Sequence, residues 1–119
     1  MKLDQDLVRE VLLAVEASEQ DPRAFFKVEI GARNSEEISY HVMLLHEAGF
    51  IEATDTGSLS RFEWQPKRLT YSGHEFLDSI RDNEVWAKTK SLAKEAGGAS
   101  ISFLWEIAKL EIKRRIGIE

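Results

Sequence analysis

The chain has 119 residues, of which 43% are apolar and 31% charged, and its formal net charge is −5. This length suits one globular domain with a single hydrophobic core. The absence of cysteine excludes disulfides, thiolate catalysis and cysteine-based zinc sites. No apolar run approaches the length of a membrane span, and the first residues, MKLDQD, lack the pattern of a signal peptide, so we expect a cytoplasmic protein.

Acidic and basic residues are unevenly distributed along the chain. Residues 1–60 carry five Lys or Arg and twelve Asp or Glu, a net charge of −7, whereas residues 61–119 carry eleven and nine, a net charge of +2. Non-specific affinity for nucleic acid comes mainly from Lys and Arg side chains that neutralise phosphates. The acidity of the first half therefore bears on any hypothesis of DNA binding.

The first predicted elements are a helix and a short strand. Apolar residues recur with a helical period over residues 7–15, and Asp4 is placed as the N-cap. The pair Asp21-Pro22 is a turn signal. The run FFKVEI, residues 25–30, is rich in aromatic and β-branched residues and predicts a strand.

A second helix is predicted to follow Asn34. Asn34 and Glu37 have the capping-box spacing, and Gly49 is suited to stop the helix after about Ala48. The predicted inward side of this helix holds Ile38, His41, Val42, Leu45 and Ala48. The predicted outward side holds Glu36, Ser39, Tyr40, Met43 and Glu47. We expect His41 to be a hydrogen-bonded structural histidine.

Two β-rich runs then predict a hairpin, over residues 50–54 and 61–65, joined by a polar loop that contains glycine. Pro66 suits the end of an edge strand. The candidates for the buried face of the hairpin are Ile51, Ala53, Phe62 and Trp64.

The last part of the chain predicts helices. Ser72 and Glu75 have the capping-box spacing, with Tyr71 and Phe76 as a hydrophobic staple. The helical pattern has a potential break at residues 81–84 and ends by the Gly97-Gly98 pair. A final helix over residues 100–116 carries two apolar arcs. One arc is Ile101, Leu104, Trp105, Ala108, Ile112 and Ile116; the other is Phe103, Ile107 and Leu110.

The second apolar arc needs a surface to cover it, and another copy of the chain would provide one. We therefore expect a homodimer through the Ile101–Ile116 helix. The lysines and arginines near the end of this helix interact favourably with the negative end of the helix dipole. We favour this role for them over a nucleic-acid-binding patch.

The order of these elements resembles the winged helix-turn-helix superfamily. Residues 40–52, YHVMLLHEAGFIE, resemble the recognition helix and following strand of PadR-like and MarR-like repressors, and residues 69–77, LTYSGHEFL, resemble the passage from their wing into the next helix. Over nearly its whole length the chain is also similar to an uncharacterised bacterial and phage family known only as a domain of unknown function.

This resemblance implies a fold but no catalytic residue. We expect an α+β, mostly helical, winged-helix domain over residues 1–119, with residues 72–96 and 100–116 as a C-terminal helical extension. A standard helix-turn-helix has a helix just before the recognition helix, and only residues 21–33 are available for it. Either residues 22–26 form a single helical turn, or the motif is degenerate.

The sequence leaves two candidate functions for this predicted fold. The leading one is a sequence-specific DNA-binding transcriptional regulator of bacterial or phage origin. In that case Ser39, Tyr40 and Met43 would face the major groove. The residues placed on phosphates would be Arg33, Arg61, Lys67 and Arg68.

The alternative is a protein-interaction module on the same scaffold that has lost affinity for DNA. A recognition helix normally offers Arg, Lys, Asn or Gln to base edges. The outward side predicted here has none of them, and residues 34–60 contain no Lys or Arg. Ser39, Tyr40 and Met43 would then form a protein-binding patch, because Tyr and Met are favoured at interfaces.

An enzyme is not expected. His74, Asp78 and Asp82 share one helical stripe with a spacing that could hold a metal, but no further ligands are apparent and the stripe is interpreted as an exposed polar face. There is no glycine-rich phosphate loop, nucleophile elbow or Ser/His/Asp arrangement. We therefore expect no metal and no cofactor.

Overall fold

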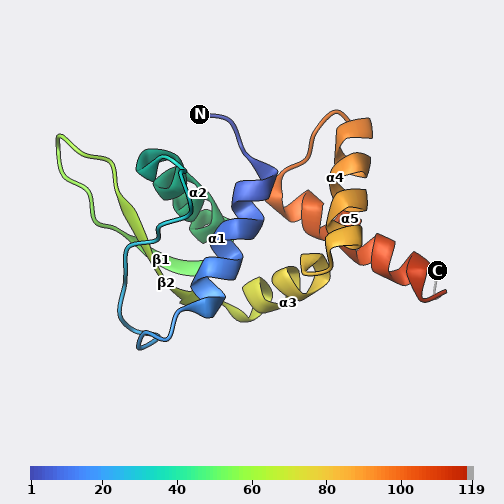
Figure 1. Ribbon diagram of the computed structural model, residues 1–119, viewed down its shortest axis with the longest axis horizontal. Helices are drawn as coiled ribbons and strands as arrows, with labels where there is room; N and C mark the ends of the chain where they lie inside the picture. Colours follow the sequence, from blue (N-terminus) through green and yellow to red (C-terminus); the bar gives the residue numbers. More distant parts are fainter. Residues whose placement is uncertain (118–119) are drawn as a thin grey trace. The chain divides into compact units, whose positions relative to one another are not determined.

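A computed structural model describes residues 1–117. Within these residues the chain is α+β and mostly helical, with five helices and one antiparallel hairpin, which confirms the predicted fold class (Figure 1). The chain divides into two compact units, the first spanning Met1–His74 and the second beginning at Glu75. The second unit begins three residues after residue 72, the predicted start of the C-terminal extension.

The first unit begins with helix α1, Gln5–Ala17. Asp4 is its N-cap, because the Asp4 side chain accepts a hydrogen bond of 3.0 Å from the Leu7 amide. The buried residues of α1 repeat at helical spacing, as predicted, and α1 packs against α2 and against the hairpin. These buried residues are Leu7, Val8, Val11, Leu12 and Val15.

Helix α2, Ser35–Glu47, occupies the predicted recognition-helix position. The Asn34 side chain accepts hydrogen bonds from the amides of Glu36 and Glu37, which confirms Asn34 as the N-cap. Gly49 has a φ of +85°, the left-handed geometry that ends a helix at low cost only for glycine. The chain therefore turns directly from α2 into the hairpin.

The hairpin pairs strand β1, Ile51–Asp55, with strand β2, Trp64–Leu69, so the second strand begins three residues later than predicted. The register shifts between Glu52 and Ala53, which is a β-bulge. Pro66 lies inside β2 and not at its end, opposite Ala53. A two-stranded sheet leaves one edge of each strand unpaired, and this is where proline is tolerated.

The predicted buried face of the hairpin is only partly correct. Ile51 is buried, but Ala53 and Trp64 are half-buried and Phe62 is 41% exposed. Phe62 lies in the loop between the strands because β2 starts later than expected. The hairpin therefore contributes fewer buried side chains to the core than its sequence predicted.

The strand predicted over residues 25–30 does not form. One backbone hydrogen bond, from the Phe26 amide to the Pro66 carbonyl at 3.1 Å, ties this segment to β2. In a strand, the N–H and C=O of one residue point to the same edge, so a residue paired with Phe26 would both accept and donate a hydrogen bond. Pro66 has no N–H and cannot donate the second bond. The ladder consequently stops after one bond.

Residues 22–26 do not form the helix that would precede a standard recognition helix. Residues 22 and 23 form a turn, in which the Ala24 amide donates to the Asp21 carbonyl at 2.8 Å and the Arg23 amide donates to the Asp21 carboxylate. The helix that a standard helix-turn-helix places before its recognition helix is therefore absent from residues 21–33.

Helix α3, Tyr71–Ile80, begins differently from the prediction. Its cap is Thr70 and not Ser72, because the Thr70 hydroxyl oxygen accepts a bond of 3.0 Å from the Gly73 amide. The predicted staple is also wrong, since Tyr71 is 78% exposed. Gly73 is required here: a Cβ at this position would lie 1.9 Å from the Phe50 carbonyl oxygen.

The second unit contains the rest of α3, helix α4, Asn83–Glu95, and helix α5, Ile101–Arg115. Asp82 caps α4 and Ser100 caps α5. The break after α3 and the stop at the paired glycines match the sequence prediction. Helices α4 and α5 pack closely against each other. The buried apolar residues of this unit are Phe76, Leu77, Ile80, Val85, Trp86, Ala93, Ile101, Leu104, Ile107 and Ala108.

Among residues 1–117, no helix combines the length and the hydropathy that crossing a membrane requires.

Candidate interaction surfaces

A polar junction joins the starts of α1 and α2. His41 is fully buried; its Nε2 accepts a bond of 2.8 Å from the Asp4 amide, and its Nδ1 donates one of 2.8 Å to the Glu37 carbonyl. These partners specify the neutral ring with the proton on Nδ1. His41 is thus a structural histidine, as predicted.

Arg33 completes this junction from outside. Its guanidinium donates to the Asp4 carboxylate at 2.6 Å and to the Glu10 carboxylate at 2.8 Å. Partial burial acts to raise the pKa of Asp4, but hydrogen bonds from Arg33 and from the Leu7 amide outweigh it and hold the pKa below its usual value. Arg33, predicted to contact phosphate, is occupied by two carboxylates of its own chain.

The outward side of α2 differs from the prediction at one residue. Ser39 is buried, and its hydroxyl oxygen accepts a bond of 3.1 Å from the Trp64 amide, so Ser39 supports the hairpin instead of facing outward. Ala48, predicted to face inward, is exposed. The error at Ser39 reflects the position of the hairpin against α2, which the sequence of the helix alone does not contain. Ala48 lies just past the end of α2, at its C-cap.

The residues that α2 presents outward form one continuous stripe, which we call the α2 face: Glu36, Tyr40, Met43, Leu44 and Glu47. The two glutamates are exposed, and the three residues between them are half-buried. Leu44 was not among the predicted outward residues, although its spacing of four from Tyr40 places it on this face. The α2 face is apolar at its centre and acidic at both ends.

The basic side chains of the hairpin are mostly paired with acidic ones. Arg68 donates to the Glu52 carboxylate at 2.6 Å and to the Leu69 carbonyl at 3.0 Å. Arg61, whose side chain is 62% exposed, lies 3.5 Å from the Glu63 carboxylate. Within residues 1–117, Lys67 makes no ion pair.

The tip of the hairpin is tightly built. Ser58 and Arg61 form an isolated β-bridge, in which the Ser58 amide donates to the Arg61 carbonyl at 2.8 Å, and this leaves a two-residue turn. The turn projects Leu59, which is fully exposed. The hairpin extends away from α2 as a wing would (Figure 1).

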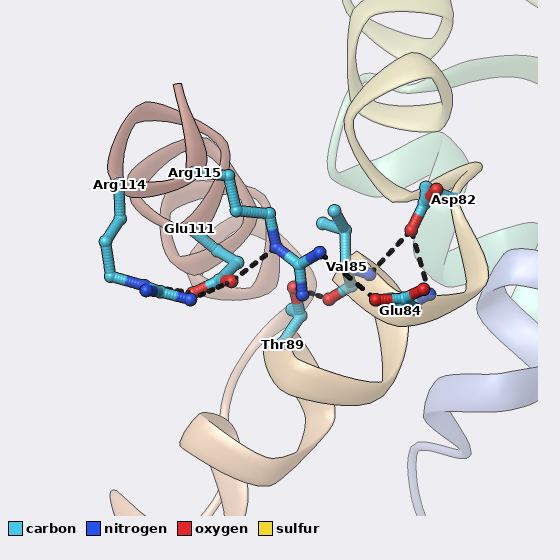
Figure 2. Close-up of polar contacts among 7 residues, drawn as sticks. All are labelled: Asp82, Glu84, Val85, Thr89, Glu111, Arg114 and Arg115. Atoms are coloured by element: carbon cyan, nitrogen blue, oxygen red, sulfur yellow. Dashed lines mark hydrogen bonds and ion pairs between the residues drawn. The ribbon is translucent and has the colours of Figure 1, made fainter. Parts of the chain in front are cut away.

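In the second unit, a buried carboxylate is held between two arginines. The side chain of Glu111 is only 1% exposed and accepts bonds from Arg114 at 3.0 and 2.7 Å and from Arg115 at 2.6 Å (Figure 2). Arg115 also lies 3.6 Å from Glu84 at the start of α4. The hydrogen bonds from Arg114 and Arg115 lower the pKa of Glu111 to about 2.

A groove of about 500 Å³ lies between α4 and α5. Leu92 and Leu110 form its apolar part, and Lys88, Glu111 and Arg114 form its polar part. Lys88 is exposed and makes no ion pair among residues 1–117. The groove therefore combines a hydrophobic patch with positive charge.

The two apolar arcs of α5 do not divide as predicted. Ile107, expected in the outer arc, is buried, whereas Ile116, expected in the inner arc, is 63% exposed. Phe103 and Leu110 remain 46% and 60% exposed. Packing of α4 against α5 covers one flank of the predicted outer arc, and the homodimer through α5 stays a prediction.

The His74, Asp78 and Asp82 stripe has other roles. Asp78 accepts a bond from Arg81 at 3.0 Å, and the Asp82 carboxylate caps α4. Within the described part of the chain, no three His, Asp or Glu side chains gather in a way that could hold a metal ion.

Residues 2–99 match the model of a family described as Hypothetical protein (DUF2513). The chain belongs to this family. It is also 38% identical over 94 residues to a protein of Haemophilus influenzae described as an uncharacterized protein, a match that covers 79% of this chain and 80% of that relative. No solved structure matches the chain. The residues matched by the family include α1 to α4 and both strands, and α5 follows them.

Proposed function

We propose that this member of the family is a protein-interaction module built on a winged-helix-like scaffold, and that it binds its partner through the α2 face. The observation that supports the proposal most directly is the composition of that face, which has Tyr40, Met43 and Leu44 between exposed glutamates. In a DNA-binding protein, the helix at this position presents basic and amide side chains to the bases.

The charges around α2 support a protein partner. Arg33 stands next to the helix but is held by Asp4 and Glu10, so redirecting it to a phosphate would cost two charge-assisted hydrogen bonds. Glu36 and Glu47 would meet DNA phosphates with like charge. An acidic duplex is consequently a poor match for this surface.

The same charges define the partner's chemistry. Interfaces typically have an apolar centre with aromatic and Met residues and a polar rim. We propose that the partner offers an apolar centre to Tyr40 and Met43 and Lys or Arg side chains to Glu36 and Glu47. Complementary rim charges mainly raise the association rate and select the partner.

A photo-crosslinking residue placed at position 43 tests this proposal in the organism that encodes the chain. A single protein should crosslink, and charge reversal of Glu36 and Glu47 to Lys should abolish the product. The same crosslinker at Tyr71, which is 78% exposed on α3, is the matched control and should give no such product. Equal products from both positions would refute the assignment of the α2 face.

DNA binding is the second candidate, and the hairpin is the observation that favours it. Lys67 is unpaired within residues 1–117, and the Arg61 side chain is exposed enough to leave Glu63 for a phosphate. Such a wing would add only a few phosphate contacts, which is a weak non-specific footprint.

A salt titration with a random-sequence duplex separates the two candidates. The protein-interaction proposal predicts no measurable anisotropy change even at low ionic strength. DNA binding predicts an affinity that falls steeply with salt, with a slope that flattens when Arg61 and Lys67 are replaced by Ala. The second result would overturn the proposed function.

A further inference from the structure

The groove between α4 and α5 is a second surface with a different character. Residues 83–117 carry seven Lys or Arg and four Asp or Glu, a net charge of +3, in a chain whose net charge is −5. This helical pair is thus the positively charged part of an acidic protein.

Two cations, Lys88 and Arg114, and one carboxylate, Glu111, line the polar end of the groove. Arg114 and Arg115 share Glu111, and Arg115 also meets Glu84 (Figure 2). Lys88 stands without an ion partner among residues 1–117. Lys88 is therefore the lining cation that no carboxylate of residues 1–117 neutralises. Because Glu111 is held by two arginines, it does not repel an approaching anion as a free carboxylate would.

The apolar part of the groove continues along α5. Leu110 is 60% exposed, and Phe103, seven residues earlier, lies on the same side of the helix and is 46% exposed. Arg114 is four residues beyond Leu110 on this side. At about 1.5 Å per residue, the distance from Phe103 to Arg114 is roughly 16 Å, or three helical turns.

We propose that this groove binds an amphipathic helix of another protein, with apolar anchors on Leu92, Leu110 and Phe103 and a carboxylate at the end that meets Lys88 and Arg114. The apolar anchors supply contact area and the carboxylate fixes the direction of the helix, as in other helix-in-groove complexes. The site uses none of the α2 residues and is independent of the proposed function.

Charge favours this occupant over a second copy of the chain. Two copies of residues 83–117, each with a net charge of +3, would repel each other if they met through this face. An acidic helix instead neutralises the excess charge at Lys88. A second copy and an anionic membrane surface are the competing occupants that the experiment must separate.

The test uses the full chain and a labelled synthetic helix with two Leu residues seven positions apart and Glu residues at one end. Anisotropy should show saturable binding, and a peptide with Lys in place of each Glu should not bind. Lys88→Glu should weaken the binding about tenfold, since it turns an attractive rim charge into a repulsive one. Leu110→Ser should abolish it.

Lys94→Glu is the matched control, because Lys94 is an exposed residue on α4 outside the groove and changes the net charge equally. Equal loss in both lysine variants, or equal affinity for both peptides, would overturn the proposal. So would a concentration-dependent dimer that Leu110→Ser abolishes, which identifies a second copy as occupant. Binding to phosphatidylglycerol vesicles without peptide binding would identify a membrane surface and also refute it.

Discussion

The two units hold their buried polar groups in different ways. In the first unit, neutral contacts dominate the interior: a buried imidazole joins two backbone groups, and a glycine lets one backbone segment touch another. The second unit differs in also burying a carboxylate, Glu111, which two arginines neutralise. The first arrangement depends on shape and the second on charge, so pH and substitutions should affect them differently.

The largest expected effect is at His41. His41→Ala leaves a cavity and removes the acceptor of the Asp4 amide, and should lower the free energy of unfolding by about 4 kcal/mol. Hydrogen exchange measured by mass spectrometry should show the loss mainly within residues 1–74. His74→Ala, at an exposed histidine, is the control. Equal loss of protection in α4 and α5 would contradict the separation of the two units.

The second largest effect on stability is expected at Gly73. A methyl group at this position would overlap the Phe50 carbonyl, so Gly73→Ala forces the backbone apart and should cost about 3 kcal/mol in chemical denaturation. Ser72→Ala changes the neighbouring residue, which does not cap α3, and should alter stability by less than about 0.5 kcal/mol. A large effect of Ser72→Ala would restore Ser72 as the cap and contradict the role of Thr70.

The smallest expected effect concerns Glu111 and depends on pH. The folded-state pKa of Glu111 is about 2, below the value of 4.5 for a free carboxyl, so its stabilising contribution is present above pH 4.5 and is lost as pH falls toward 2. Glu111→Gln should reduce the thermal stability at neutral pH and weaken its dependence on pH in this window.

Glu106→Gln is the control for this measurement. Glu106 pairs with Lys109 at 2.9 Å, but its side chain is 60% exposed, and exposed ion pairs contribute little. The pH profile of Glu106→Gln should therefore follow that of the unmodified chain. Identical profiles for Glu111→Gln and the unmodified chain would show that the charged network does not stabilise the second unit.

The sequence by itself determined the helices and most of their ends. Asp4 and Asn34 are correct caps, and Gly49 ends α2 as expected. These predictions are correct because a cap or a left-handed glycine acts within one turn of the backbone. His41 was also interpreted correctly, since its place on the inward side of α2 requires partners for both ring nitrogens.

Only the tertiary structure decided which outward residues are available. Ser39 is covered by the hairpin, Arg33 is held by α1, and Ile107 is buried, although each was predicted to face a partner. The strand over residues 25–30 failed for a similar reason, because strand formation depends on the neighbour and the neighbour here is a proline. Hydrophobic periodicity shows which side chains share a face of a helix or strand. Which part of the protein covers that face is determined by contacts between residues distant in sequence.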